Sequence, residues 1–545
     1  MTETLSTDCY PVTLAPGQTR LFLDFCEPAA PVRDFYASLG RDGQWQKRPE
    51  IPAHHAEITR LLAAQNPGPG ASQTLGALGA GAGTVLTGQQ VTLFGGPLFT
   101  PLKMATVVAR ARQAARAGHP HVPIFWLATE DHDFAEVNHA DFPARREIER
   151  LVYPDAPGVP QPVGGVPLGD AIVPLVERAA ELMGASEAAD ALLAAYQPGR
   201  TFAQAFADFY AKMFAAQGLL VLDASGREFH RIGAPVLRAG IEQADELHAA
   251  LLDRNRKLEQ AGYHAQVAVM EHSSLLFLID GKTGERVALK RTPPSAAEPG
   301  GLWSTVAHAG QTEAVHYSTG DLLGILASEP ERISPSALLR PVFQDYLLST
   351  SLIVGGPAEI AYFAQTAVLY DRILGRQTAF TPRFSATLIE PAVGELLRKY
   401  ELKLDRVFEE NEESLAKLLA DRVMPPEGRQ RLTAAGKALD IELALLLDWM
   451  RTQDEGLGKS AETAANKMQY QMSRLRGLAE NFQLQREASL RKHAQLISQA
   501  LFPGGVMQER IHAAAYYFAR FGVELAETLS SHAEKTCPGH MALWL

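Results

Sequence analysis

A buried strand that is followed at once by a dense polar cluster constrains this chain more than any other feature. The apolar run at residues 122–128 has the composition of a strand that is buried on both faces of a parallel sheet. The next eleven residues, 129–139, contain two histidines and four carboxylates. Because open α/β sheets bind ligands at the carboxyl ends of their strands, we expect a ligand site here. A solvated loop that caps the next helix is the alternative interpretation.

The size and charge of the chain argue against several classes of protein. With 545 residues it is too long for one simple core, so we expect two or more domains. The net charge of −11 argues against a nucleic acid or an anionic membrane as the main partner. The first residues lack the features of a signal peptide, and no apolar run approaches the roughly 20 residues that span a bilayer. We therefore expect a soluble cytoplasmic protein.

The three cysteines of the chain are far apart in the sequence, at Cys9, Cys26 and Cys537. They do not have the spacing of metal ligands. We therefore expect neither a disulfide framework nor a zinc knuckle, and this cysteine content fits a reducing compartment.

Sequence patterns divide the chain into three regions. Residues 1–390 mix strand-like runs, helices and turns rich in Gly and Pro, as α/β proteins do, with an expected inserted subdomain at about 145–310. Residues 391–501 have almost no strand signal and are rich in Leu, Glu, Lys, Arg and Gln. Residues 502–545 return to a globular composition, and we expect them to pack back on the core.

The helical region carries heptad spacing. Apolar residues alternate spacings of four and three, which is typical of helices packed along a left-handed seam. Pro425 and Pro426 separate a first helix from a second, and residues 456–458 separate the second from a third. The third, about 40 residues long, would reach about 60 Å. We expect it to project and to form a homodimer, with an intramolecular antiparallel bundle as the alternative. Two heptad series are Val393, Leu397, Tyr400, Leu404 and Val407, and Met468, Met472, Leu475, Ala479 and Phe482.

Two strand–glycine–helix turns offer a place for an anion. The first follows the strand at 84–87, and the second follows the apolar strand near 353. Glycines before a helix allow close approach of a ligand, and the helix N-terminus favours negative charge. No P-loop and no G-x-G-x-x-G fingerprint occurs in the first turn, and a plain turn is the alternative there. The candidate binding residues of the two turns are Thr87, Gly88, Gln89, Gln90, Gly95, Gly96, Gly355, Gly356 and Glu359.

Further polar residues are candidates for the same crevice, because neighbouring turns of a parallel sheet face one another. Arg383, on a loop before the helical region, could clamp a phosphate or could be a plain surface charge. These additional binding candidates are Arg340, Gln344, Asp345, Arg383 and Ser385.

The polar cluster itself supports two chemistries. Asp131, His132 and Asp133 are the catalytic candidates: the carboxylates could hold a substrate ammonium while His132 donates to a phosphate or shuttles a proton. Alternatively, His132, His139 and carboxylates could bind a metal, but their spacing is weak evidence for one. We favour the metal-free site, with His139 as a binding residue. No Ser-His-Asp or Cys-His arrangement can be singled out.

Several blocks together resemble one known family. The chain is similar to the BshC family, the cysteine-adding enzymes of bacillithiol biosynthesis, and the similarity runs in order along nearly the whole chain. The blocks are TGQQVTLFGGP at 87–97, FWLATEDHDF at 125–134, RPVFQD at 340–345, VGGPAEIAY at 354–362 and MQERIH at 507–512.

The resemblance implies both a fold and an activity. The fold is a Rossmann-like, doubly wound α/β core related to class I aminoacyl-tRNA synthetases, with inserted connecting segments and a coiled coil that mediates dimerisation. The activity joins the carboxyl group of cysteine to the amine of glucosaminyl-malate, which requires an activated carboxylate. ATP or another nucleotide is the suspected cofactor, with residues 87–97 in the position of the first nucleotide-binding signature. Residues 131–133 and 355–359 would line the amino-acid and ribose side.

The sequence departs from the synthetase pattern in two places. The block at 87–90 has no histidine pair, and the loop at 381–386 has an arginine but is not rich in lysine. The activated donor is therefore open. A non-catalytic substrate-binding or scaffold protein and a metal hydrolase acting in reverse are the alternative functions.

Overall fold

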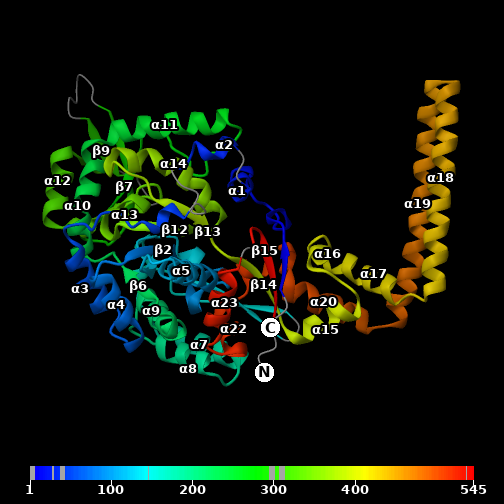
Figure 1. The fold of residues 1–545 in the computed structure, drawn as a ribbon, viewed down its shortest axis with the longest axis horizontal. Coiled ribbons are helices and arrows are strands. Elements are labelled where there is room, and N and C mark those ends of the chain that lie inside the picture. Colours follow the sequence, from blue (N-terminus) through cyan, green and yellow to red (C-terminus); the bar gives the residue numbers. More distant parts are fainter. Residues whose placement is uncertain are drawn as a thin grey trace.

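The protein consists of a body and a helical arm that projects from it (Figure 1). The computed structural model describes residues 7–27, 30–36, 43–144, 147–293, 301–305, 314–535 and 537–545. Among these residues, none of the helices combines the length and the apolar character that crossing a membrane requires.

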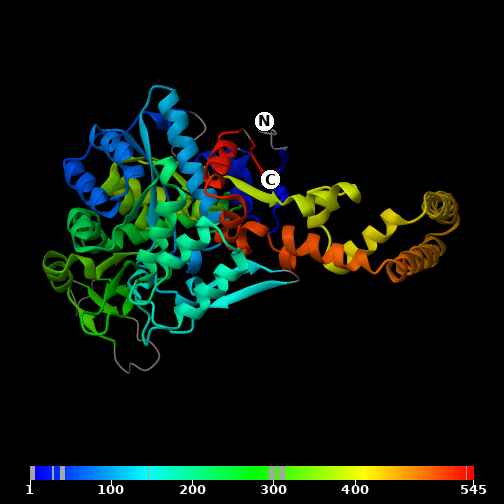
Figure 2. The same ribbon diagram turned by 90° about the horizontal axis from the view of Figure 1, so that it is seen from below.

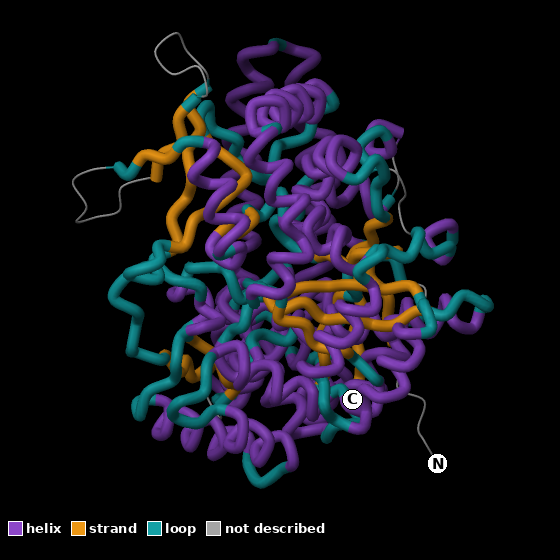
Figure 3. Tube along the Cα trace, turned by 90° about the vertical axis from the view of Figure 1, so that its left-hand side faces the viewer, coloured by secondary structure: helices purple, strands orange, loops and turns teal. Residues whose placement is uncertain are grey.

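A parallel sheet of five strands forms the centre of the body, which confirms the predicted Rossmann-like α/β fold. Figure 3 shows these strands enclosed by helices. The apolar runs found in the sequence are the inner strands, and every residue of β3 and β12 is buried. The strands, in sheet order, are β13 (Ala379–Pro382), β12 (Thr350–Gly355), β2 (Gly83–Gln89), β3 (His121–Leu127) and β6 (Leu220–Asp223).

Each face of the sheet contributes to its own hydrophobic core. Phe125 and Leu127 of β3 pack into one core, while Ile124 and Trp126 pack into the other. This alternation explains why the run has no polar residue, because both faces of a parallel sheet are covered. Helices α5 (Phe99–Arg116) and α14 (Pro357–Ile373) begin close after β2 and β12. Their N-termini therefore lie at the carboxyl edge of the sheet.

The prediction of one inserted subdomain at 145–310 is wrong, because β6 falls inside that range and pairs with β3 in the central sheet. The chain leaves the sheet twice. A run of four apolar or acidic residues does not reveal which sheet it joins, since that depends on contacts distant in sequence. Before β6 come α6 (Phe134–Val137), β4 (His139–Pro143), β5 (Ile148–Val152), α7 (Ile172–Met183), α8 (Glu187–Ala195) and α9 (Phe202–Met213).

The second excursion, between β6 and β12, carries an antiparallel sheet in the order β10-β9-β8-β7-β11. Strands β7 and β8 pair antiparallel across the turn at 280–284. Helices and strands of this segment are α10 (Arg227–Glu242), α11 (Ala244–Gln260), β7 (Ser273–Ile279), β8 (Arg286–Thr292), β9 (Leu302–Thr305), β10 (His316–Tyr317), α12 (Thr319–Ser328), β11 (Ile333–Pro335) and α13 (Arg340–Leu348).

The arm is a hairpin of two long helices that pack along each other, α18 (Pro426–Gln453) and α19 (Glu455–Arg486) (Figures 1 and 2). The predicted third helix of about 40 residues is interrupted, since α19 ends at Arg486 and α20 (Ser489–Leu501) follows. The first heptad series is also divided, between α15 (Pro391–Lys399) and α16 (Leu404–Phe408). Its residues fill a compact core with α17 (Glu412–Val423) and α20 at the base of the arm.

The two ends of the chain meet in a second small sheet. Strand β15 (His540–Trp544) lies between β1 (Thr7–Tyr10) and β14 (Ser385–Ile389). Before it, α21 (Gln508–Ile511), α22 (Ala514–Phe521) and α23 (Leu525–Ala533) return to the body, where α23 packs on α5.

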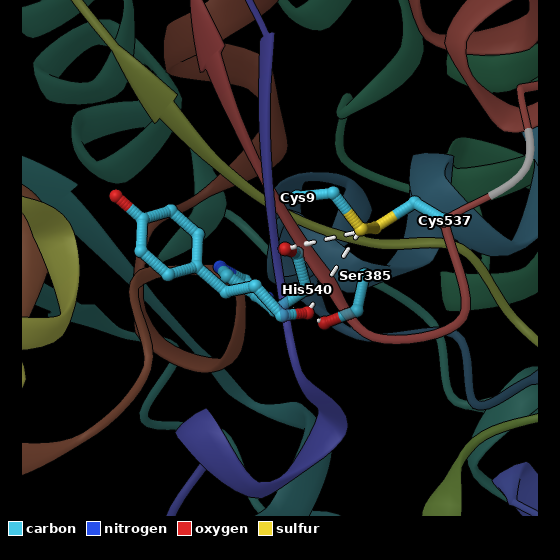
Figure 4. The surroundings of a disulfide bond; sticks show 5 residues. Cys9, Ser385, Cys537 and His540 are labelled. Atoms are coloured by element: carbon cyan, nitrogen blue, oxygen red, sulfur yellow. Dashed lines mark hydrogen bonds between the residues drawn. A yellow bond between two sulfur atoms is a disulfide. The ribbon is translucent and has the colours of Figure 1, made fainter.

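Contrary to the sequence expectation, Cys9 and Cys537 form a disulfide (Figure 4). They are 528 positions apart, and β1 and β15 bring them together by pairing antiparallel. Sequence spacing could not reveal this pair, because the contact is created by the sheet that joins the two ends.

Candidate functional site

A cavity of about 490 Å³ opens at the carboxyl ends of β2, β3 and β12. Its walls come from the three segments predicted to meet there: the turn after β2, the polar cluster after β3 and the turn after β12. The turn after β2 lies close to Arg340, since a Cβ added to Gly88 would be 3.3 Å from Nη1 of Arg340. The predicted residues that line it are Gly88, Gln89, Gln90, Asp131, His132, Arg340, Gly356, Glu359 and Arg383.

Other predicted residues lie outside this cavity. Gly96 and His139 line an adjoining cavity of about 200 Å³. Thr87 is buried, and its hydroxyl donates to the carbonyl of Val354 at 2.8 Å. Gly95 is buried against Phe209 and Tyr210, and Gly355 ends β12. Thr87, Gly95 and Gly355 therefore shape the strands and turns rather than face the cavity.

Asp133 does not occupy the predicted catalytic position. Its side chain is exposed and caps α6, where Oδ1 accepts the backbone N–H of Glu136 at 3.2 Å. A carboxylate at a helix start satisfies N–H groups that lack a partner within the helix. The alternative interpretation, in which the residue caps the next helix, therefore holds for Asp133. Asp131 and His132 face the cavity.

Asp345 and Gln344 also lie away from the cavity, within the packed face of α13. Asp345 accepts the Thr350 N–H at 2.6 Å and lies 2.7 Å from Nη1 of Arg376. Burial raises the pKa of Asp345 to about 6, although Arg376 acts in the opposite direction. This carboxylate supports the start of β12 and is not part of the cavity wall.

Asp131, His132 and Arg286 form a polar part of the cavity wall. Asp131 accepts from Nε2 of Gln90 at 2.6 Å and from the His132 backbone N–H at 2.7 Å. Burial would raise the pKa of Asp131, but the Gln90 hydrogen bond, the backbone hydrogen bond and the Arg286 charge together hold it below its ordinary value. Asp131 is therefore an anion at neutral pH.

Arg286 fixes the orientation of His132. Its Nη1 lies 2.9 Å from Nδ1 of His132, and its guanidinium lies 3.6 Å from the centre of the Phe277 ring. Because arginine only donates, Nδ1 accepts, and Nε2 carries the proton of the neutral ring. Ser334 and the Pro335 carbonyl hold the rest of the guanidinium at 3.0 and 3.3 Å. Sequence reasoning missed Arg286 because it lies in a hairpin 154 positions from His132.

Lys103 is a second residue that sequence reasoning missed. Its ammonium group donates to the carbonyl of Gly88 at 2.8 Å, to Oε1 of Gln89 at 2.9 Å and to the carboxylate of Glu359. Glu359 in turn accepts the Gly356 N–H at 2.8 Å. Burial lowers the pKa of Lys103, and Glu359 counteracts that effect. The sequence signal that could have identified Lys103 is its place as the only charged residue in the run at 97–109.

Arg340 is a half-buried cation at the cavity wall. Its Nη2 donates to the hydroxyl of Tyr362 at 2.6 Å. Among the described residues, no carboxylate lies within ion-pair distance of Arg340. A cation held by a neutral partner keeps donor capacity for an anionic ligand.

Glu130 lines the same cavity and is supported from behind by His230 of α10. Nε2 of His230 lies 3.2 Å from Oε1 of Glu130, and Nδ1 lies 3.0 Å from the carbonyl of Ile333. Burial alone would lower the pKa of His230, but Glu130 raises it above the ordinary value. No sequence pattern points to His230, which lies 100 positions further along the chain than its partner.

Arg383 stands between this cavity and a second one of about 390 Å³. It forms a buried ion pair with Glu509, a residue that sequence reasoning noted only within a block of family resemblance. Burial would raise the pKa of Glu509, and Arg383 lowers it below its ordinary value. Ser385 faces the second cavity, where its hydroxyl contacts Glu509 at 3.0 Å and Nδ1 of His540 at 2.8 Å. Ser385 is therefore not a wall of the first cavity.

Within the described part of the chain, no group of three or more His, Cys, Asp or Glu residues is arranged to hold a metal ion. The polar groups of the cavity instead form ion pairs and hydrogen bonds with one another. Their mixed charges suit a ligand that carries both an ammonium and an anionic group.

The fold and the cavity define a Rossmann-like α/β protein with a charged cavity at its strand ends and a coiled-coil arm. Comparison with protein families gives the particular group. Residues 6–384 match the family model "Bacillithiol biosynthesis BshC, N-terminal Rossmann-like domain", and residues 386–543 match "Bacillithiol biosynthesis BshC, C-terminal coiled-coil domain". The chain belongs to the BshC family.

Relatives support this assignment along the full length. A protein of Koribacter versatilis is 38% identical over 98% of this chain and 99% of its own length. A protein of Solibacter usitatus is 33% identical over 97% of this chain and 98% of its own. One from Salinibacter ruber is 31% identical over 95% of this chain and 94% of its own. The names of all three relatives include the words cysteine ligase BshC.

Proposed function

We propose that this protein is a cytoplasmic ligase that joins the carboxyl group of cysteine to the amine of glucosaminyl-malate. The observation that carries the proposal is the convergence of three strand ends on one cavity that contains both carboxylates and cations. The membership of the BshC family and the names of its relatives support the reaction class. Resemblance to class I aminoacyl-tRNA synthetases remains a prediction.

The cavity residues have distinct parts in the proposed reaction. Asp131 and Glu130 are the anions available to an α-ammonium group, and Arg340 is the cation available to a carboxylate or a phosphate. His132 presents its Nε2 proton, because Arg286 occupies Nδ1. That proton can stabilise negative charge that develops on the carbonyl oxygen during acyl transfer.

Amide formation needs an activated carboxyl group, because a free carboxylate does not react with an amine at a useful rate. ATP or another nucleotide is the proposed source of activation. The amine attacks the activated carbonyl carbon, loses one proton and expels the leaving group. The cations Lys103, Arg340 and Arg383 are the residues able to hold an anionic leaving group, since all three line the cavity.

A direct assay tests the proposal. Purified protein with cysteine, glucosaminyl-malate, magnesium and ATP is expected to yield bacillithiol, measured by mass spectrometry. In cells that lack their own copy, Asp131→Asn and His132→Ala are expected to abolish production of the thiol. Asp133→Asn is the matched control, because Asp133 caps α6 outside the cavity. Normal production by the Asp131 and His132 variants would exclude this cavity as the site.

We also propose that the arm joins two copies of the chain. Its two long helices pack on each other yet leave large apolar side chains exposed. On α18 these recur every four residues, which places them on one helix face. A second copy would cover this surface and so remove apolar area from water. The exposed residues include Ile441, Leu445 and Trp449 on α18, and Met468, Leu475 and Phe482 on α19.

A further inference from the structure

The second cavity, of about 390 Å³, lies between the two ends of the chain. One wall comes from the N-terminal segment, including Val12 and Phe22, and another from residues 533–535 and 537–540. The Cys9–Cys537 disulfide is the covalent link between these segments. Cys537 lines the cavity, and so does Cys26, so two of the three cysteines lie in its wall and Cys9 is bonded to one of them.

The two cysteines of the disulfide differ in their surroundings. Cys9 is exposed on β1, at the edge of its sheet, whereas Cys537 is half-buried and faces the cavity. A thiolate in solution therefore reaches the Cys9 sulfur more readily. Access to one sulfur determines which half of a disulfide is attacked.

We propose that Cys9–Cys537 is a thiol–disulfide exchange site for low-molecular-weight thiols. A thiolate attacks the Cys9 sulfur, the bond between the two cysteines breaks, and Cys537 leaves as a thiolate. A second thiolate attacks the mixed disulfide, which releases Cys9 as a thiolate and the small thiol as its disulfide. Two electrons pass from two small thiols to the protein, and the small disulfide reverses the reaction.

Exchange at this site opens the cavity. Without the bond, β1 is held to β15 by a ladder of four residue pairs, Thr7 to Tyr10 against Leu543 to His540. A short strand at a chain end separates readily when a cross-link is removed, because termini need such ties to stay ordered. Cys26 lines the cavity and is only 2% exposed in the closed state. Opening of the cavity therefore makes it accessible.

The opening reaches the first cavity through hydrogen-bonded side chains. His540, three residues after Cys537, contacts Ser385 at 2.8 Å (Figure 4). Ser385 contacts Glu509, which pairs with Arg383, and Arg383 lines both cavities. The thiol state at the chain ends is therefore coupled to a cation of the ligand cavity.

Peptide mapping identifies the attacked sulfur. The full-length oxidised protein is mixed with cysteine at millimolar concentration and quenched at short times with an alkylating reagent. The expected intermediate carries cysteine on Cys9 and the alkyl group on Cys537. The reverse labelling would overturn the assignment of Cys9, and a bond that persists in the folded protein would overturn the exchange site.

Alkylation of Cys26 reports the opening. It is expected to be at least about tenfold faster in reduced than in oxidised protein, with unchanged circular dichroism. A Cys9→Ser/Cys537→Ser variant is expected to react at the faster rate whatever the thiol present. Equal protection of Cys26 in both states would overturn the opening. Because neither measurement uses ligation, a failure here is distinct from a failure of the proposed function.

Discussion

Lys103 and Glu359, 256 positions apart, form a largely buried ion pair that joins the two glycine turns of the first cavity. Lys103 holds the Gly88 carbonyl after β2, and Glu359 holds the Gly356 N–H after β12. Each turn is therefore positioned by a helix residue, and the pair sets the distance between the turns. A rigid frame of this kind supports a site that must hold reacting groups in place.

Replacing Lys103 with methionine is expected to destabilise the protein by about 3 kcal/mol, because it leaves the Glu359 carboxylate without its partner in a largely buried position. Urea denaturation measures the change. Lys103→Met combined with Glu359→Gln is expected to be less unstable than Lys103→Met alone, because the stranded charge is removed. Equal stability of Lys103→Met and the unsubstituted protein would show that the pair does not hold the frame.

Features that depend only on nearby residues are recognisable in the sequence. The run at 122–127 was recognisable as a buried strand because its composition depends on its own two faces, and the polar cluster after it lies where parallel strands place ligands. Heptad spacing identified α18 and α19 as long helices for the same reason.

Features that depend on distant segments were not recognisable. The sheet that receives β6, the Cys9–Cys537 bond and the partner of Lys103 each depend on contacts made by the finished topology. Asp133 shows that nearness in sequence does not by itself place two residues in the same cavity. It is only two positions from Asp131 in the sequence, yet it caps a helix outside the cavity.

Stability is expected to depend on pH through His540, which is fully buried between the hydroxyls of Ser385 and Thr387. Burial lowers the pKa of His540 to about 4, below the roughly 6.5 of an unfolded chain. As pH falls below about 6.5, the unfolded state binds a proton that the folded state does not, so stability is lost. Between pH 7 and pH 5 this loss is about 2 kcal/mol for one histidine.

The variant His540→Gln tests that assignment. Its free energy of unfolding, measured in urea, is expected to fall about 2 kcal/mol less between pH 7 and pH 5 than that of the unsubstituted protein. Comparing variant with parent cancels other groups, such as Asp345, whose raised pKa acts in the opposite direction.

Arg340 is expected to bind an anionic group of a substrate, and its variants separate charge from geometry. Arg340→Met is expected to raise the KM of the anionic substrate at least about tenfold, and Arg340→Lys to recover only part of the loss because lysine lacks the planar donor fork. Tyr362→Phe removes one hydrogen bond and is the milder control. A KM that Arg340→Met leaves unchanged would exclude this role.

The proposed dimer is expected to depend on the exposed apolar face of the arm. Removing all of residues 391–501 is a poor test, because α15, α16, α17 and α20 form a core with Ile389 and Ala542 of the body.

Point variants on the exposed apolar face of the arm test the dimer without disturbing that core. Leu445 and Leu475 are 63% and 55% exposed, so glutamate at either position leaves the monomer intact while placing a charge in an apolar contact. In sedimentation velocity, Leu445→Glu/Leu475→Glu is expected to run as a monomer at concentrations where the parent is a dimer. Gln471→Glu adds a charge at an exposed polar position and is expected to remain dimeric. If the double variant sediments as the parent does, the two copies associate through another surface, and the arm has a different partner.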